Sequence, residues 1–247
     1  MTSELREKLL FALLSFSALV PAIMLHEVAH GYAALMCGDR TAKEAGRLSL
    51  NPLRHVDPFM SVILPAILAL SGSRVLFGGA KPVPIDLRRC RDPMKAYWIT
   101  AIAGPLCNLA QAVLGALLFA GTTALLDHIA AHPGSLGWIA QSWTEPSWTG
   151  GVVQVRASLW FDLLRVWLYL YVSTNAVLMV FNLVPVPPLD GSRVVTVLLP
   201  PSLRWRYASI ERYGLLLIFG LLYIPAFNET IWRLVEGFLR LVGMDFD

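Results

Sequence analysis

The sequence predicts an all-α polytopic membrane protein, one domain over residues 1–247 built as a bundle of four spanning helices. Composition is the first reason, because 56% of the 247 residues are hydrophobic and only 15% are charged. The second reason is length, since a helix needs about 20 residues to cross the hydrocarbon of a bilayer. The third is that Lys and Arg cluster in particular loops. The uncharged runs are 9–25, 58–73, 96–126, 166–189 and 213–228.

These uncharged runs differ in length. Runs 96–126 and 166–189 are long enough to cross a bilayer, and the first run becomes long enough because its apolar character continues to Met36, so we expect a retained span rather than a signal peptide. Run 58–73 is short and is expected to enter the membrane without crossing it; the spans number five or six if short segments also cross. Run 213–228 forms the fourth span if its helix begins earlier in the chain.

Basic residues predict which loops face the cytoplasm. Segment 37–96 carries ten Lys and Arg, whereas 127–158 carries one, and four more follow in 193–212. By the positive-inside rule the first and last of these segments are cytoplasmic and the middle one faces outward. This arrangement gives four crossings with both termini outside, and the basic residues Arg6 and Lys8 argue against the N-terminal part of it.

Segment 230–242 has helical spacing of its apolar residues. One face carries Ile231, Leu234, Val235, Phe238, Leu239 and Val242, and the other carries Arg233, Glu236 and Arg240. Such a helix lies either in the membrane interface or against the bundle, and the sequence leaves both placements open.

The stretch HEVAH, at 26–30, places two histidines and a glutamate near the end of the first apolar run. Residues four apart share a helix face, so His26 and His30 can point their imidazoles at one ion while Glu27 stands beside it. Zinc lowers the pKa of a bound water towards neutrality, and a neighbouring carboxylate takes the proton. Ionisable side chains in a span are costly, which favours a functional site over three residues that merely satisfy one another.

A catalytic zinc ion usually has three protein ligands, so a third ligand is expected from elsewhere in the chain. Asp190 is the best candidate, because it follows an apolar span that breaks at the stretch PVPP. Irregular backbone at membrane depth is tolerated where it lines a cavity, although the carboxylate of a D-G pair can also serve only a turn. His26 lies about 26 Å along its helix from the start of the run. His26 and Asp190 therefore lie in the same half of the membrane only if 58–73 does not cross. Otherwise another irregularity must keep the number of crossings between them even.

With these residues the sequence resembles the site-2 protease family of intramembrane zinc metalloproteases, in its compact form without PDZ or CBS domains. The resemblance covers nearly the whole chain through HEVAHGYAA, GRLSLNPLRHVDP, FGGAKPVPID, AGPLCNL and NLVPVPPLDGSR. It implies that His26, His30 and Asp190 bind one Zn²⁺ per chain and that Glu27 activates water.

The resemblance also implies a substrate and a location. It implies cleavage of transmembrane protein substrates in the lipid bilayer of the cell membrane, with the active site towards the cytoplasmic side. Asn182, eight residues before Asp190, is implied to lie near the substrate backbone, where an amide can both donate and accept. Capping of the broken helix is the alternative role. The sequence does not determine the particular substrate, regulatory partners or oligomeric state.

Two intervening segments predict a small membrane-associated β-hairpin near the active site. The stretch GRLSL at 46–50 alternates polar and apolar residues, AKPVPID at 80–86 is extended by its prolines, and the family tends to form such a hairpin. An exposed edge there would accept an unwound substrate by β-augmentation. A solvated loop is the alternative.

Other polar residues receive structural predictions. Gly104 and Asn108, in AGPLCN, predict a close helix contact with a polar partner, or a wall of the catalytic cavity. His55 is expected at the surface. His128 and His132 have the spacing of metal ligands but no neighbouring glutamate and no third ligand, so we expect an interfacial pair.

Several classes of function are excluded or disfavoured. The net charge of +3 is too small to indicate nucleic acid, and the three cysteines are unpaired in spacing. Five histidines are too few for a membrane di-iron oxygenase, and no G-x-S-x-G indicates a serine protease. The remaining alternative is a catalytically silent zinc-binding membrane protein, a pseudoprotease or metal carrier. Glu27 weighs against it, because zinc binding alone does not need that carboxylate.

Overall fold

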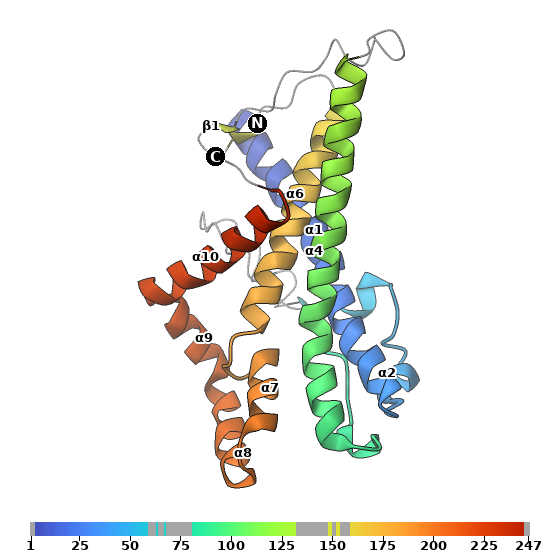
Figure 1. Ribbon diagram of the computed structural model, residues 1–247, viewed down its shortest axis with the longest axis vertical. Helices are drawn as coiled ribbons and strands as arrows, with labels where there is room; N and C mark the ends of the chain where they lie inside the picture. The colour runs from blue at the N-terminus through green and yellow to red at the C-terminus, as the bar shows by residue number, and fades with distance from the viewer. Residues whose placement is uncertain are drawn as a thin grey trace.

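The computed structural model describes residues 3–58, 63, 67, 81–131, 148–149, 152–153 and 159–244. Its long helices are α1 (Ser3–Met36), α4 (Pro93–Ala131) and α6 (Leu159–Asn182). They pack against one another, and the shorter helices that follow α6 lie along one side of them (Figure 1). Each long helix holds a stretch that is long and apolar enough to cross a membrane: Lys8–Met36, Pro93–His128 and Phe161–Asn182.

Small side chains let the long helices approach closely. Ala22 of α1, Ala112 of α4 and Ala176 of α6 are fully buried. Gly115 of α4 has no room for a side chain, because a Cβ there would lie 2.7 Å from a methyl group of Val172. Interfaces of this kind are typical of membrane bundles, where association depends on close van der Waals packing. The close packing brings residues of α1, α4 and α6 to one place in the bundle.

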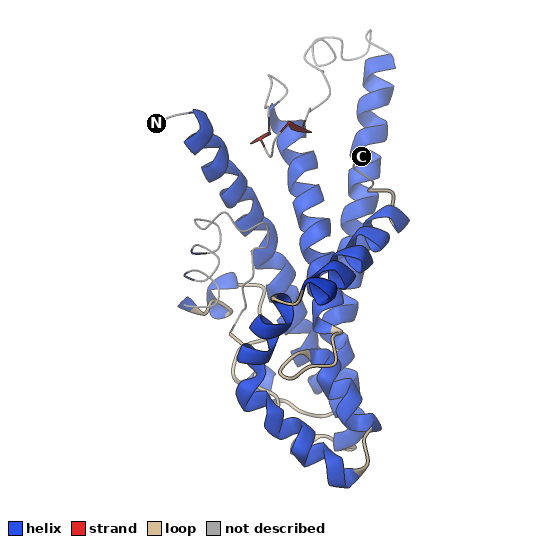
Figure 2. Ribbon diagram, turned by 90° about the vertical axis from the view of Figure 1, so that its left-hand side faces the viewer, coloured by secondary structure: helices blue, strands red, loops and turns tan. Residues whose placement is uncertain are grey.

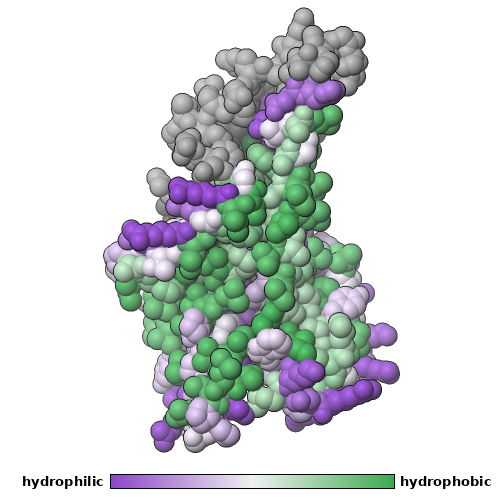
Figure 3. Space-filling model, in the orientation of Figure 1, coloured by the Kyte–Doolittle hydropathy of each residue, from purple (hydrophilic) through white to green (hydrophobic). Residues whose placement is uncertain are grey.

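Large apolar side chains cover the outside of the bundle. Leu13 on α1 is 65% exposed and Leu117 on α4 is 66% exposed. Hydrophobic residues occupy most of the face drawn in Figure 3, and hydrophilic ones gather towards its lower edge and at its upper part. An apolar surface of this extent is a liability in water and is the normal surface in lipid. The structure thus agrees with the composition in indicating a membrane protein.

Helix α6 ends at Asn182, and α7 (Asp190–Leu198) begins after an irregular stretch. Prolines have no backbone N–H to donate, so the helix cannot continue regularly through PVPP. The chain turns back sharply enough that Gly191, the second residue of α7, packs against the backbone of Leu183, where a Cβ would clash with the carbonyl group. This turn holds Asp190 beside the end of α6.

The predicted fourth span is not confirmed. After α7 come α8 (Pro201–Ala208), η4 (Ser209–Tyr213), α9 (Gly214–Leu222) and α10 (Pro225–Leu241). Helix α9 has nine residues and is therefore only about 14 Å long. Pro225 starts a new helix because a proline suits the first helical position and interrupts a preceding one. Within the described residues, three helices meet the length and hydropathy of a span.

Helix α10 packs on the bundle, which decides between the two placements that the sequence left open. Val235 and Leu239 are buried in one apolar cluster with Ala112 of α4 and Val172 of α6. The helix crosses α6 obliquely (Figures 1 and 2). Leu234 remains 55% exposed, so the bundle covers only part of the apolar face.

The predicted β-hairpin is not confirmed either. Neither 46–50 nor 81–86 contains a strand, and the strands of the described residues, β1 (Trp148–Thr149) and β2 (Val152–Val153), pair with each other between α4 and α6. The two prolines of 81–86 have no N–H to give a ladder. The carbonyl oxygens of Lys81 and Pro82 instead accept from the guanidinium of Arg47, at 2.6 Å and 3.4 Å. Segment 81–86 is therefore extended and is held by side chains and by one backbone hydrogen bond, from the N–H of Lys81 to the carbonyl oxygen of His55, at 2.8 Å.

Two predictions lie outside the described residues. The re-entrant segment 58–73 is one, apart from Pro58, Ile63 and Ile67. The pairing of His128 with His132 is the other, because His132 is not described.

Candidate metal centre

His26 and His30 lie one turn apart on α1 and direct their Nε2 atoms to the same point. The two Nε2 atoms are 3.0 Å apart, and the rings meet edge to face at 85°. Both residues are buried, with 6% and 5% of their surface exposed. The spacing of four residues in HEVAH therefore places two imidazole nitrogens together inside the bundle, as predicted.

Asp190 reaches the same point from the start of α7. Its Oδ2 lies 3.2 Å from His26 Nε2 and 3.1 Å from His30 Nε2. Its other oxygen, Oδ1, lies 3.6 Å from the guanidinium of Arg193, one turn further along α7. Residues 164 positions apart in the chain thus share one buried site, and the carboxylate is oriented with one oxygen towards the histidines.

The three converging atoms fit a zinc ion. Tetrahedral coordination with bonds of about 2.0–2.2 Å separates neighbouring ligand atoms by about 3.3–3.5 Å, close to the separations of 3.0–3.2 Å found here. Asp190 Oδ2 is buried and has no hydrogen-bond partner. A buried carboxylate oxygen without a partner is costly, and a cation between the three atoms removes that cost.

Glu27 stands beside the ligands and points to a different partner. Its carboxylate, with one ligand atom from each of His26 and His30, forms a group in which all three atoms lie within 4.8 Å of one another. Its Oε2 accepts a hydrogen bond from the backbone N–H of Val83, at 3.0 Å. Glu27 is half-buried, so it is near enough to exchange a proton at the site without being needed as a ligand.

One face of α4 supports the two histidines. The Nδ1 atom of His30 lies 2.6 Å from the carbonyl oxygen of Thr100, and Nδ1 of His26 lies 2.5 Å from Oδ1 of Asn108. Gly104 lies between them, where a Cβ would come within 2.6 Å of His26 Nε2 and would also contact His30 Nε2. Second contacts of this kind orient metal-ligating histidines. AGPLCN therefore makes a close helix contact with polar partners, which is the first of its two predicted roles.

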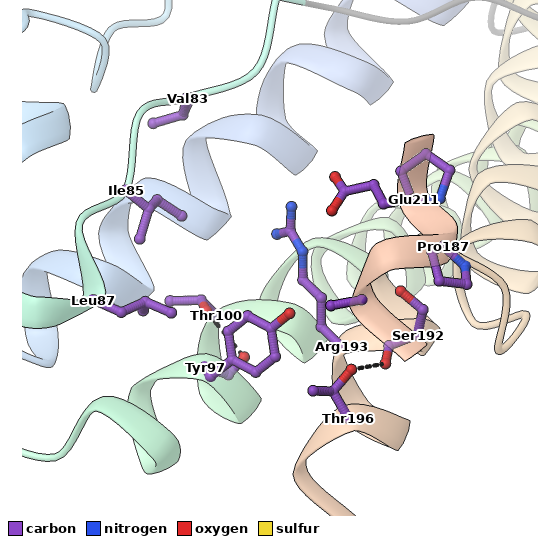
Figure 4. A pocket seen from close by; sticks show the side chains of 12 residues that line it. Val83, Ile85, Leu87, Tyr97, Thr100, Pro187, Ser192, Arg193, Thr196 and Glu211 are labelled. Atoms are coloured by element: carbon purple, nitrogen blue, oxygen red, sulfur yellow. Dashed lines mark hydrogen bonds between the residues drawn. The ribbon is translucent and has the colours of Figure 1, made fainter. Parts of the chain in front are cut away.

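A cavity of about 330 Å³ is lined by residues that contact His30, Glu27 and Asp190, although none of these three residues lines it (Figure 4). The extended segment forms one wall with Val83 and Ile85, and α7 forms the opposite wall with Ser192, Arg193 and Thr196. Thr100, whose carbonyl group contacts His30, also lines the cavity. The cavity thus lies between the backbone that holds Glu27 and the helix that presents Asp190.

The structure does not bring Asn182 to the ligands. Its Nδ2 donates to the carbonyl oxygen of Leu178, at 2.9 Å, at the end of α6. This bond reaches back one turn within α6, so it tests neither the capping role nor the substrate role, and both stay predictions. His55, expected at the surface, is 2% exposed with Nε2 2.8 Å from the carbonyl oxygen of Ser49, so that expectation was wrong.

Two supporting residues were missed. Thr100 acts through a backbone carbonyl, which carries no residue-specific signal, and Arg193 looks like an ordinary loop cation in the sequence. The sequence nevertheless held a signal for Thr100. It lies four residues before Gly104, which lies four before Asn108, so the three share one helix face.

Comparison with known proteins gives the family that the sequence motifs resemble. The model of the family described as Peptidase family M50 matches residues 14–224. The chain is 32% identical over 219 residues to "Putative zinc metalloprotease YwhC" of Bacillus subtilis (strain 168), covering 89% of this chain and 84% of that protein. It is 29% identical over 223 residues to "Putative zinc metalloprotease Rip2" of Mycolicibacterium smegmatis, covering 90% of this chain and 71% of that protein. No solved structure matches.

The extent of these matches includes all four residues of the candidate centre. The family match begins before the histidine pair and ends after Asp190, and it spans most of the chain. The chain therefore belongs to peptidase family M50, the site-2 protease family.

Proposed function

We propose that this protein is a zinc-dependent intramembrane endopeptidase that cleaves transmembrane segments of membrane-protein substrates. The observation that carries the proposal is the convergence of His26, His30 and Asp190 at one buried point, with Glu27 beside it. The three convergent residues would hold one zinc ion per chain. Bound zinc supplies Lewis-acid chemistry, which polarises a peptide carbonyl and makes water acidic near neutral pH.

Glu27 performs the proton transfers of the proposed reaction. Its carboxylate takes a proton from water as the water oxygen bonds to the peptide carbon. It then gives the proton to the amide nitrogen as the C–N bond breaks, which leaves a carboxylic acid and an amine. Transfer of the remaining proton of the acid to the amine gives a carboxylate and an ammonium group. The hydrogen bond from Val83 leaves one carboxylate oxygen free for this exchange.

The cavity is suited to an unwound peptide. Peptide bonds of a transmembrane helix are shielded by their own hydrogen bonds, so the segment must open locally before it is cut. The cavity has extended backbone along one wall and the short helix α7 along the other. An opened segment would lie between them and present one carbonyl group to the site.

We infer that the site faces the cytoplasmic half of the cell membrane. Segment 37–96, which carries ten Lys and Arg, connects α1 to α4 at the end of the bundle nearer the histidines. The closeness of His26 and Asp190 supports a topology in which 58–73 does not cross, since an extra crossing would place them in opposite halves.

Glu27→Gln tests the proposal against the catalytically silent alternative. We would reconstitute the protein in vesicles with a tagged single-span substrate, and measure cleavage by immunoblot and zinc by elemental analysis. The expected result is one zinc per chain in both proteins and cleavage only by the wild type. Cleavage by Glu27→Gln would remove Glu27 as the base, and zinc without cleavage in the wild type would favour the silent protein.

A further inference from the structure

A chain of buried hydrogen bonds runs from His26 across three helices. His26 Nδ1 on α1 lies 2.5 Å from Oδ1 of Asn108 on α4. Asn108 Nδ2 donates to Oδ1 of Asn175 on α6, at 2.7 Å, and Asn175 Nδ2 donates to the carbonyl oxygen of Tyr171, at 2.9 Å. Asn108 and Asn175 are both 0% exposed. Both amides are therefore closed to bulk solvent.

The last acceptor fixes the direction of the whole chain. The carbonyl group of Tyr171 can only accept, so Asn175 must turn its amino group towards it and its oxygen towards Asn108. Asn108 must then turn its amino group towards Asn175 and its oxygen towards His26. Because that oxygen can only accept, His26 must donate from Nδ1. A neutral imidazole that carries its proton on Nδ1 has its lone pair on Nε2.

A second, weaker contact favours the same orientation of the Asn108 amide. Asn108 Nδ2 also lies 3.4 Å from the carbonyl oxygen of Ala22. This bond is long in comparison with the 2.7 Å bond to Asn175. Asn175 is therefore the principal partner that holds the Asn108 amide in one orientation.

His30 reaches the same tautomer without a relay. Its Nδ1 lies 2.6 Å from the carbonyl oxygen of Thr100, which can only accept. Both histidines would thus present a lone pair on Nε2 to a cation held beside Asp190. The difference is that the tautomer of His26 depends on two side chains, which substitution can change.

We propose that Asn175, acting through Asn108, is a positioning residue that holds His26 in the tautomer needed to bind the metal. The proposal rests on the proposed function, because it takes His26 as a zinc ligand. An amide in an apolar bundle is costly unless its groups are satisfied, and interhelical hydrogen bonds also stabilise bundles. The experiment must therefore separate a role towards His26 from a role in packing.

Asn175→Leu breaks the relay while keeping the size of the side chain. It frees the Asn108 amide to rotate and offer its amino group to His26, which then carries its proton on Nε2. We expect zinc affinity, measured by chelator competition, to fall about 10- to 100-fold. In metal-free protein labelled with ¹⁵N-histidine, we expect a proton on Nδ1 of His26 in the wild type and the loss of that Nδ1–H signal in Asn175→Leu. Only five histidines are present, so the signals can be assigned by substitution.

Ser17→Ala is the matched control. It removes the hydrogen bond from the indole N–H of Trp167 on α6 to the hydroxyl of Ser17 on α1, at 3.0 Å, which also joins two helices of the bundle. It leaves Asn175, Asn108 and the backbone carbonyl group of Tyr171 in place, so we expect zinc affinity and the His26 tautomer to stay as in the wild type. Thermal unfolding would show whether each variant is folded, and Asn175→Ala replaces Asn175→Leu if the larger side chain prevents folding.

The outcomes separate this proposal from the proposed function. Unchanged zinc affinity and an unchanged His26 tautomer in folded Asn175→Leu would overturn the relay. Equal losses of zinc affinity in Asn175→Leu and Ser17→Ala would also overturn it, because bundle stability alone would explain both. The tautomer is measured without metal, so it tests the relay even if the wild type fails to cleave any substrate.

Discussion

The backbone N–H of Val83 donates a hydrogen bond of 3.0 Å to Oε2 of Glu27. This bond connects the proposed base on α1 to the extended segment 81–86, which forms one wall of the cavity. The position of the base therefore depends on a part of the chain more than fifty residues away. A substrate that lies along that wall would be close to the base.

Val83→Pro tests this connection by removing the N–H. The neighbouring residues are already prolines, so an extended backbone is retained. A hydrogen bond to a charged group is worth about 1.5–3 kcal/mol, so we expect kcat to fall about 10- to 100-fold with zinc content unchanged. Val83→Ala keeps the N–H and should retain most of kcat. An unchanged kcat in Val83→Pro would show that Glu27 is oriented without this segment.

Gly104→Ala should remove zinc while leaving the bundle folded. The added methyl group would lie 2.6 Å from His26 Nε2, in the space where the ligand atoms converge. Overpacking against two buried rings costs about 1–3 kcal/mol and the helix preference of alanine offsets about 1 kcal/mol, so the metal-free protein should lose no more than about 2 kcal/mol of stability and remain folded. Elemental analysis and thermal unfolding provide the two measurements.

Gly121→Ala is the matched variant for this test. Gly121 lies on the same helix, and nothing is within 4 Å of a Cβ built there. We expect it to bind zinc as the wild type does. Full zinc content in Gly104→Ala would mean that the histidines bind metal at a different point from the one described.

The sequence predicted that these residues would converge because the relevant relationships are local or chemically conspicuous. His26 and His30 share a face in any α-helix, and Asp190 is a carboxylate that follows a span broken by prolines. Asn175 could not be predicted in the same way. Its role depends on how α6 packs against α4, and a single asparagine in a span does not indicate its partner.

The sequence predicted the fold less completely than the site. The β-hairpin and the fourth span were not confirmed, each for a different physical reason. An extended segment such as 81–86 satisfies its backbone with side chains as readily as with a partner strand, and its prolines disfavour a ladder. Hydropathy predicted one span over 213–228, but Pro225 divides the helix there. The amphipathic pattern of α10 defined an apolar face without indicating whether lipid or protein covers it.

Thr196→Phe should obstruct the cavity without affecting the metal. Thr196 lines the cavity from α7, and its hydroxyl donates to the carbonyl oxygen of Ser192 (Figure 4). Misfit in a packed site typically costs about 1–3 kcal/mol, so we expect KM to rise about tenfold with zinc content unchanged. Leu198→Phe, on the same helix at a position 78% exposed, should leave KM unchanged. Normal KM in Thr196→Phe would place the substrate elsewhere.

Asp39 should make the stability of the protein sensitive to acid. Its carboxylate accepts from the N–H and hydroxyl of Thr41, at 2.8 Å and 2.5 Å, and from the N–H of Asp86, at 2.7 Å. Burial raises the pKa of the Asp39 carboxyl, but the hydrogen bonds together lower it by more, so the pKa lies below its ordinary value. The carboxylate thereby fastens the end of segment 81–86 to the loop after α1.

Asp39→Asn tests that contribution through its dependence on pH. A carboxyl whose pKa is lowered by folding stabilises the protein above its unfolded pKa of about 3.9, and this stabilisation is lost as the pH falls through the folded pKa. At pH 7 we expect the free energy of unfolding of Asp39→Asn to be about 1.5–3 kcal/mol lower than that of the wild type, so the variant should unfold at a lower temperature. The difference should shrink as the pH falls below about 4. Glu44→Gln removes an exposed ion pair with Arg89 and should change stability little at either pH. If the stability difference between Asp39→Asn and the wild type were the same at pH 7 and below about pH 4, shape and not charge would hold this end of the segment.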